Sequence, residues 1–136
     1  MDDPFDIPNV ILPRDGEDGL RRAKIAAQLI ADNRGRDIVI LDLRTQTYAF
    51  DYFVIATGSS QRQLHAMSDA IDEVFEKELK EHKVGGEGYR SGHWVLLDYG
   101  DVVIHLFDED TRDYFRLEEL WGGGTRIPFE PAETVD

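Results

Sequence analysis

Apolar side chains recur along this chain at two different spacings, and the spacing distinguishes predicted helices from predicted strands. From about residue 18 to residue 33 they follow a helical period, and Gly35 supplies the stop. A second helical stripe runs through residues 64–79, shortly after Ser59 and Ser60, whose hydroxyl groups suit a helix N-cap. The pattern therefore predicts two amphipathic helices before the chain reaches its glycine-rich middle.

Short, continuous apolar runs at residues 38–41 and 52–56 are rich in β-branched side chains and predict strands inside a sheet. Two further runs, at residues 94–97 and 102–107, flank the turn residues 98–101 and predict an antiparallel hairpin. The glycine-rich residues 83–92 predict a loop that leads into this hairpin.

The hairpin register follows if Tyr99 and Gly100 are the two loop residues. It then gives three facing pairs on one side: Asp98 with Asp101, Leu96 with Val103, and Trp94 with His105. This side mixes rings, acids and aliphatic groups, so we expect protein to cover it only in part. The opposite side is aliphatic throughout and is predicted to be core: Val95, Leu97, Val102, Ile104 and Leu106.

Residues 108–121 predict a short acidic helix after the hairpin. Tyr114, Leu117 and Trp121 fall at i, i+3 and i+7, which puts them on one stripe of that helix. Such a stripe is usually core. Its place beside Trp94 and the local negative charge favour a second interpretation, in which the rings anchor a partner protein.

The element order predicts the fold class α/β (α+β), a single domain with a mixed β-sheet and helices packed on it. A length of 136 residues suits one domain with a real core. Residues 1–17 carry prolines among acids and predict an irregular acidic N-terminal arm. Residues 122–136 begin with three glycines and predict a flexible C-terminal tail without packed structure, which leaves residues 18–121 as the domain.

The net charge and its distribution indicate which class of partner this protein binds. The chain has 15 basic and 28 acidic residues, a net charge of −13, and residues 98–119 alone carry eight acids and two bases, or −6. Such a surface repels membranes and phosphate backbones, and it favours a basic protein partner over direct binding of nucleic acid. Solubility alone is the alternative explanation.

No cysteine, no signal-peptide pattern and no apolar run of about twenty residues is present, so we expect a cytoplasmic protein that does not enter membranes. The four histidines lack metal-ligand spacing, and no cofactor motif occurs, so we expect neither a metal nor a cofactor. His105 either titrates near neutral pH or packs in the sheet, and packing is favoured. Nucleophilic catalysis has no support in the spacing, so no catalytic residue is predicted.

Gly58-Ser59 lies between a predicted strand and a predicted helix, where backbone N–H groups can cradle a phosphate. Nucleotidyltransferases begin their site with such a turn and add two metal-binding carboxylates one residue apart. Asp69 stands at a tolerable distance, but the partner position is Ile71, and Asp69 and Asp72 belong to the solvated side of a helix pattern. A capping turn is therefore favoured over a phosphoryl-transfer site.

Several stretches occur between Leu20 and Trp121 in one order: DYFVIATGSSQR at 51–62, EG at 87–88, WVLLD at 94–98, GDVVIH at 100–105, Arg112, Tyr114 and LEELW at 117–121. Together they resemble the ribosomal silencing factor family, RsfS, also called Iojap. The resemblance implies a nucleotidyltransferase-like topology without the catalytic carboxylates. It also implies a translation repressor that binds the large ribosomal subunit at its protein number fourteen and sterically blocks joining of the small subunit when nutrients are scarce. Family members can also form homodimers.

Under this resemblance, the expected partner-binding surface has apolar anchors and acidic neighbours. The anchors are Trp94, His105, Tyr114, Leu117 and Trp121, and the acids that meet lysines or arginines are Asp98, Asp101 and Glu118. Two alternatives stay open. One is a nucleotidyltransferase-like enzyme that uses the Gly58-Ser59 turn, and the other is a dimeric scaffold whose aromatic residues meet only each other.

Overall fold

The computed structural model describes residues 15–133, so the arm predicted for residues 1–17 lies almost wholly outside the described part. The elements follow in this order: α1 (Glu17–Asp32), β1 (Arg36–Asp42), β2 (Tyr52–Thr57), α2 (Gln61–Glu73), a π-helical turn η2 (Val74–Glu78), β3 (Gly85–Glu87), β4 (Trp94–Asp98), β5 (Val102–Phe107), α3 (Glu109–Phe115), α4 (Leu117–Leu120) and β6 (Thr125–Ile127).

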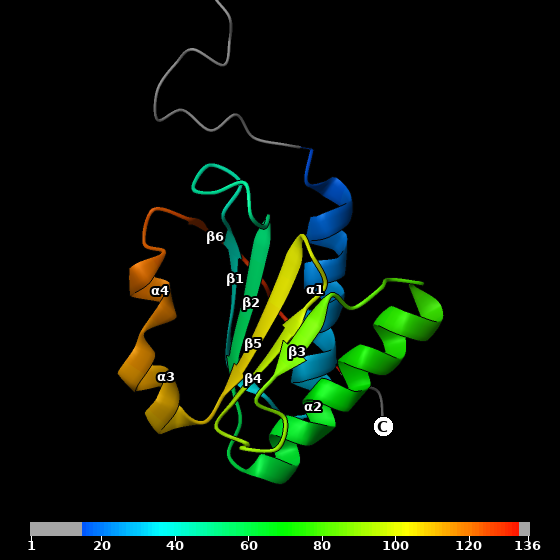
Figure 1. Cartoon of the computed structure of the whole chain (residues 1–136), viewed down its shortest axis with the longest axis vertical. Coiled ribbons are helices and arrows are strands. Elements are labelled where there is room, and N and C mark those ends of the chain that lie inside the picture. Colours follow the sequence, from blue (N-terminus) through cyan, green and yellow to red (C-terminus); the bar gives the residue numbers. More distant parts are fainter. Residues whose placement is uncertain (1–14, 134–136) are drawn as a thin grey trace, which may run out of the picture.

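The strands form one six-stranded sheet in the order β3-β4-β5-β2-β1-β6. Only the β2–β5 pair is parallel among the described strands, and the other neighbours are antiparallel. Helices α1 and α2 cover one face of the sheet, and α3 and α4 lie against the other (Figure 1). The predicted class, α+β with a mixed sheet in a single domain, is confirmed.

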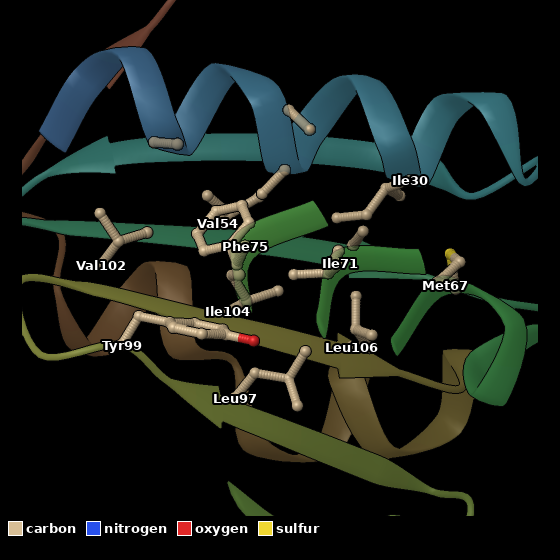
Figure 2. Packing of buried hydrophobic residues seen from close by; sticks show 14 of the residues in the cluster. Ile30, Val54, Met67, Ile71, Phe75, Leu97, Tyr99, Val102, Ile104 and Leu106 are labelled. Atoms are coloured by element: carbon tan, nitrogen blue, oxygen red, sulfur yellow. The ribbon is translucent and has the colours of Figure 1, made fainter. Parts of the chain in front are cut away.

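The face under α1 and α2 holds the larger core. Figure 2 shows Ile30 of α1 and Ile71 of α2 pointing toward Val54 and Ile104 of the sheet, and all four are fully buried. The five hairpin side chains predicted to be core all belong to this cluster. Burial of each large aliphatic side chain contributes about 1.5–3 kcal/mol, so this face supplies most of the hydrophobic stabilisation.

The start of α2 is set by a hydroxyl cap, as predicted. Ser60 Oγ accepts a hydrogen bond of 3.1 Å from the Gln63 backbone N–H. Beyond Glu73 the helix continues as η2, with Phe75 fully buried, so the apolar stripe predicted to Leu79 is confirmed. The prediction that Asp72 lies on the solvated side of this helix is corrected. Asp72 is only partly exposed, and it accepts hydrogen bonds from the Tyr99 hydroxyl and the Lys83 ammonium.

The hairpin of β4 and β5 forms, but its predicted register is wrong by two residues. Trp94 pairs with Phe107 and Leu96 pairs with His105, and the loop residues are Gly100 and Asp101. Tyr99 stays in the ladder because its ring is buried, whereas Gly100 adopts a φ of +91° that suits the first loop position. A shift of two preserves the alternation of side chains, so the predicted faces are confirmed for the strand residues. Asp101 was predicted on the side of Trp94, but it meets Arg22 of α1 on the other side.

The acidic segment is two helices where one was predicted. Arg116 takes a left-handed conformation with φ +49° and ends α3, and α4 begins at the next residue. This break turns the second helix, so Tyr114 is 80% exposed while Leu117 is 8% exposed. The predicted single stripe of Tyr114, Leu117 and Trp121 is therefore wrong, because the spacing rule applies only to an unbroken helix.

The C-terminal residues contradict the prediction of a tail without packed structure. Thr125–Ile127 form β6 and pair with β1, which covers the otherwise open edge of that strand. Phe129 packs against the larger core, and the Gln28 side-chain amide exchanges hydrogen bonds with the Ala132 backbone N–H and C=O. The domain boundary at residue 121 is therefore too early for the part of the tail that the structure describes.

The predicted loop at residues 83–92 contains the short edge strand β3, which pairs with β4. Gly88 has a φ of +82°, and a Cβ added there would lie 1.8 Å from the Trp94 carbonyl oxygen, so the loop approaches β4 as closely as backbone allows. Within residues 15–133, no helix has the length and apolar character that a bilayer crossing requires.

Candidate protein-binding surface

The second face of the sheet combines aliphatic side chains with several aromatic rings. A cluster from β1, β2 and β5 lies beneath α4 and contains Leu41, Leu43, Phe53, Ile55, Val103, Phe107 and Leu117. Trp94, Leu96 and Trp121 border it and are only partly buried. Two short helices cannot cover a sheet of this width, so the face remains open along β4.

Four rings form a continuous row from the core to the solvent, and we call them the aromatic row: Phe107, Trp94, Phe115 and Tyr114. Ring centroids lie 4.8 Å apart for Phe107 and Trp94, 4.8 Å for Trp94 and Phe115, and 5.0 Å for Phe115 and Tyr114. Exposure rises along it from 1% at Phe107 to 42% at Phe115 and 80% at Tyr114. Exposed aromatic groups that continue a buried cluster are typical of protein contact sites.

His105 does not lie on the exposed part of this surface, which corrects its predicted role as an anchor. It is 4% exposed, its ring lies edge-on to Phe53 at 4.5 Å, and its Nδ1 accepts a hydrogen bond of 3.1 Å from the Trp94 indole N–H. Burial lowers the pKa of His105 from 6.5 to about 4, so the imidazole is neutral near pH 7. The favoured interpretation, packing in the sheet, is therefore correct.

The other predicted anchors divide between core and surface. Leu117 is only 8% exposed and packs in the cluster beneath α4, so it offers a partner little surface and its assignment as an anchor is corrected as well. Trp121 is half-buried and meets Phe50 and Phe53 edge-on at 5.4 and 5.7 Å. Trp94 is also half-buried, and Tyr114 is open to solvent.

The three predicted rim acids all have partners within the chain. Asp98 Oδ1 accepts a 2.8 Å hydrogen bond from the Gly100 N–H and so fixes the hairpin turn. Asp101 forms a two-pronged ion pair with buried Arg22 of α1, on the opposite side of the sheet from α3 and α4, and this carboxylate raises the pKa of the guanidinium. Glu118 is paired with Arg112. These contacts compete with any contact to a partner, and the role of the three acids at a partner stays a prediction.

Other acids surround the exposed rings instead. Residues 109–120 hold five acids and two bases, a net charge of −3, and Asp110, Asp113 and Glu119 are exposed. The acidic character predicted for this region is present, but different carboxylates carry it. Charge alone could not show this, because the pairing of Asp101 with Arg22 joins positions 79 residues apart.

Arg112 fixes α3 and α4 to the sheet. Its guanidinium donates to the Thr57 hydroxyl at 2.8 Å and to the Asp37 carbonyl at 2.6 Å, and it also binds Glu118 of α4 at 2.9 Å. Its side chain is 12% exposed. One side chain thus ties both short helices to the ends of β1 and β2, where little apolar area is available to hold them.

Sequence reasoning missed two exposed apolar residues of this surface, Phe115 at 42% and Leu120 at 72%. In an unbroken helix the predicted stripe would leave Phe115 on another side. Phe115 reaches Trp94 because the helix breaks at Arg116. The sequence does not predict this break, since arginine is not a residue that usually adopts the left-handed conformation.

The positions considered as metal-binding carboxylates for the Gly58-Ser59 turn do not form a pair. Asp69 is exposed on α2 and accepts a 3.2 Å hydrogen bond from the Tyr89 hydroxyl, and Ile71, at the position where a second carboxylate would be needed, is fully buried. Among the described residues, no group of three or more histidine or acidic side chains is arranged to hold a metal ion. The geometry is that of the capping turn.

Comparison with known proteins assigns the chain to a family. Residues 17–136 match the family model described as "Ribosomal silencing factor during starvation". The chain belongs to the ribosomal silencing factor family. It is 43% identical over 101 residues to "Ribosomal silencing factor RsfS" of Chromobacterium violaceum, a match that spans 74% of this chain and 82% of that protein.

Two further relatives extend the comparison. A mouse protein named "Mitochondrial assembly of ribosomal large subunit protein 1" is 36% identical over 96 residues, which are 68% of this chain and 42% of that protein. A crystal structure of a Chromobacterium violaceum protein superposes with a TM-score of 0.71 at 38% identity, and it covers 86% of this chain and 92% of that one. The family assignment based on spaced stretches of sequence is therefore confirmed, and the family match continues through β6 to the C-terminus.

Proposed function

We propose that this protein binds the large ribosomal subunit through its protein number fourteen and prevents the small subunit from joining. The contact would be made by the exposed end of the aromatic row, with Trp121 and Leu120 beside it. The observation that carries the proposal is the placement of exposed rings on a surface edged by acids in a member of the ribosomal silencing factor family.

The chemistry of the two sides supports this partner. Ribosomal proteins are basic, and a protein of net charge −13 attracts them while avoiding exposed ribosomal RNA. Asp110, Asp113 and Glu119 steer the approach, and the rings supply the affinity once water is excluded. The name of the mouse relative refers to assembly of a large ribosomal subunit, which fits a partner on that subunit.

The mechanism is occlusion. A factor seated on a surface that the small subunit needs represses translation without catalysis, so this protein requires no cofactor or metal and acts where ribosomes are, in the cytoplasm. The family resemblance also implies a homodimer, which is part of the proposal.

The test compares matched tyrosine variants. Tyr114→Ala removes an 80% exposed ring of the aromatic row, whereas Tyr89→Ala removes a ring that stacks on His65 of α2 at 3.9 Å. We expect Tyr114→Ala to weaken co-sedimentation with purified large subunits by about 2 kcal/mol, or about thirtyfold, and Tyr89→Ala to leave it within about twofold.

A sucrose gradient then checks the mechanism. The parent protein should reduce the fraction of joined ribosomes when the two subunits are mixed, and Tyr114→Ala should restore it. Equal binding by Tyr114→Ala and the parent, with both proteins folded, would contradict the proposed surface. Binding without loss of joined ribosomes would contradict occlusion.

A further inference from the structure

Trp94 has two kinds of contact, ring packing and one hydrogen bond, and they constrain the indole differently. Its indole lies flat on Phe107 with 30° between the ring planes and meets Phe115 at 47°, both with centroids 4.8 Å away. Ring contacts of this kind change little when the indole slides or turns over by rotation about χ2, a torsion with broad, nearly two-fold preferences. The ring contacts fix the plane of the indole, but they do not determine which edge of the indole faces the solvent.

The hydrogen bond to His105 removes that freedom. The indole N–H is a donor only, and it reaches His105 Nδ1 at 3.1 Å, so just one of the two ring orientations satisfies it. Nδ1 must be the unprotonated nitrogen to accept this bond, which puts the imidazole proton on Nε2.

His105 Nε2 is buried and has no hydrogen-bond partner among the described residues. A buried donor without an acceptor destabilises a fold, and an apolar ring at this position would avoid that cost. The ring contacts of His105 are with Phe53, Phe107 and Trp94, so packing alone would be met at least as well by phenylalanine. The histidine is therefore explained by its acceptor nitrogen rather than by its volume.

We infer that His105 is a positioning residue for partner binding, which holds the Trp94 indole in one orientation before the partner arrives. The inference rests on the proposed function, because Trp94 is the half-exposed ring through which the aromatic row leaves the core. A ring that is already ordered loses less conformational entropy on binding, so the effect appears as affinity.

Two variants of His105 separate positioning from packing. His105→Phe keeps a ring and removes the acceptor. His105→Asn keeps an acceptor oxygen near the Nδ1 position and loses volume. If His105 only packs, partner binding depends on folding stability alone, and the phenylalanine variant binds the partner at least as well as the asparagine variant. If His105 positions Trp94, the phenylalanine variant is the more stable of the two but binds more weakly than the asparagine variant.

The first readout needs no partner. The protein has two tryptophans, so its indole N–H groups give two signals in a proton–nitrogen NMR spectrum, and Trp94→Phe identifies which belongs to Trp94. We expect the Trp94 signal to exchange slowly with solvent in the parent and in His105→Asn, and fast in His105→Phe. An unchanged signal and exchange rate in His105→Phe would overturn the inference.

The second readout is co-sedimentation with purified large ribosomal subunits. We expect His105→Phe to bind about three- to tenfold more weakly than the parent although its melting temperature is equal or higher, and His105→Asn to bind within about twofold. In the Trp94→Phe background, where no indole donor exists, His105→Phe should have no further effect.

The proposed function is tested separately by Trp94→Ala. If Trp94→Ala binds large subunits like the parent, the assignment of Trp94 to the contact surface fails, and the positioning role fails with it. If Trp94→Ala loses binding while His105→Phe binds like the parent, the contact surface stands and the positioning role is overturned.

Discussion

The two faces of the sheet differ in chemistry and in how completely they are covered. The face beneath α1 and α2 is mainly aliphatic (Figure 2). Helices of 16 and 13 residues cover it. The other face has a smaller mixed core with more rings at its border, and it carries helices of seven and four residues. The first face is buried and serves stability, whereas Trp94, Phe115 and Trp121 on the second face remain partly exposed.

The difference also appears in what holds the helices. α1 and α2 are held by broad apolar contact, with Ala23, Ala26 and Ile30 fully buried on α1. α3 has no buried residue and α4 has one, Leu117, so these helices depend on the polar contacts of Arg112. We therefore expect α3 and α4 to open locally more readily than α1 and α2.

The largest expected effect comes from truncating matched leucines on the two sides. Leu106 is fully buried beneath α1 and α2, whereas Leu120 of α4 is 72% exposed. Leu106→Ala should lower the free energy of unfolding by about 3 kcal/mol, and Leu120→Ala should change it by no more than about 0.5 kcal/mol. Urea unfolding measures both. Similar losses in the two variants would break the distinction between the faces.

Low pH should destabilise the protein in part through protonation of His105. His105 has a pKa lowered from 6.5 to about 4 by burial, so below pH 6.5 the unfolded chain binds a proton that the folded protein does not. The free energy of unfolding therefore falls as the pH drops from about 6.5 to about 4, by about 2 kcal/mol at pH 5. His105→Phe should lose this component, and parallel pH curves for parent and variant would contradict the assignment.

Removing the Arg112 contacts should loosen α3 and α4 alone. Arg112→Met leaves Glu118, which is 17% exposed, without its cation, and should reduce the local opening free energy of α3 and α4 by about 1–2 kcal/mol. Hydrogen exchange should accelerate in residues 109–120 and stay unchanged in α1. Arg116→Met is the control, because Arg116 is 65% exposed and meets Glu119 only at 3.4 Å. Equal acceleration in both variants would show that Arg112 has no special role.

The smallest expected effect concerns charge. Glu119 of α4 and Glu73 of α2 have side chains that are 71% and 68% exposed. Under the proposed function, Glu119→Gln should slow association with large subunits by about twofold at low salt, whereas Glu73→Gln should not change it. Stopped-flow mixing at two salt concentrations measures this. A salt-independent rate for the parent protein would argue against electrostatic steering of the approach.

Local patterns in the sequence were sufficient for much of the fold. The helical periods, the buried strands, the Ser60 cap and the two faces of the hairpin were all predicted, because each depends on residues that are neighbours in the chain. Side-chain alternation along a strand has a period of two, so even the register error at Tyr99 left the faces of the strand residues correct. The family resemblance rested on the same kind of local, ordered stretches.

The positions of the candidate site residues in the fold were predicted in part. Trp94, Tyr114 and Trp121 lie on the partly exposed second face, whereas His105 and Leu117 are buried in it and the three predicted acids are engaged within the chain. Each of these outcomes depends on a partner distant in sequence or on one backbone torsion, such as the contact of Asp101 with Arg22 or the left-handed Arg116.

By itself, the sequence determined which side chains share a face of each unbroken helix or strand, and that one side of the hairpin is aliphatic while the other mixes rings, acids and aliphatic groups. Only the tertiary structure decided which rings stay exposed, which carboxylates are already paired and how β6 closes the edge of β1. The physical reason is that periodicity is fixed by the geometry of one element, whereas burial and ion pairing depend on which elements meet.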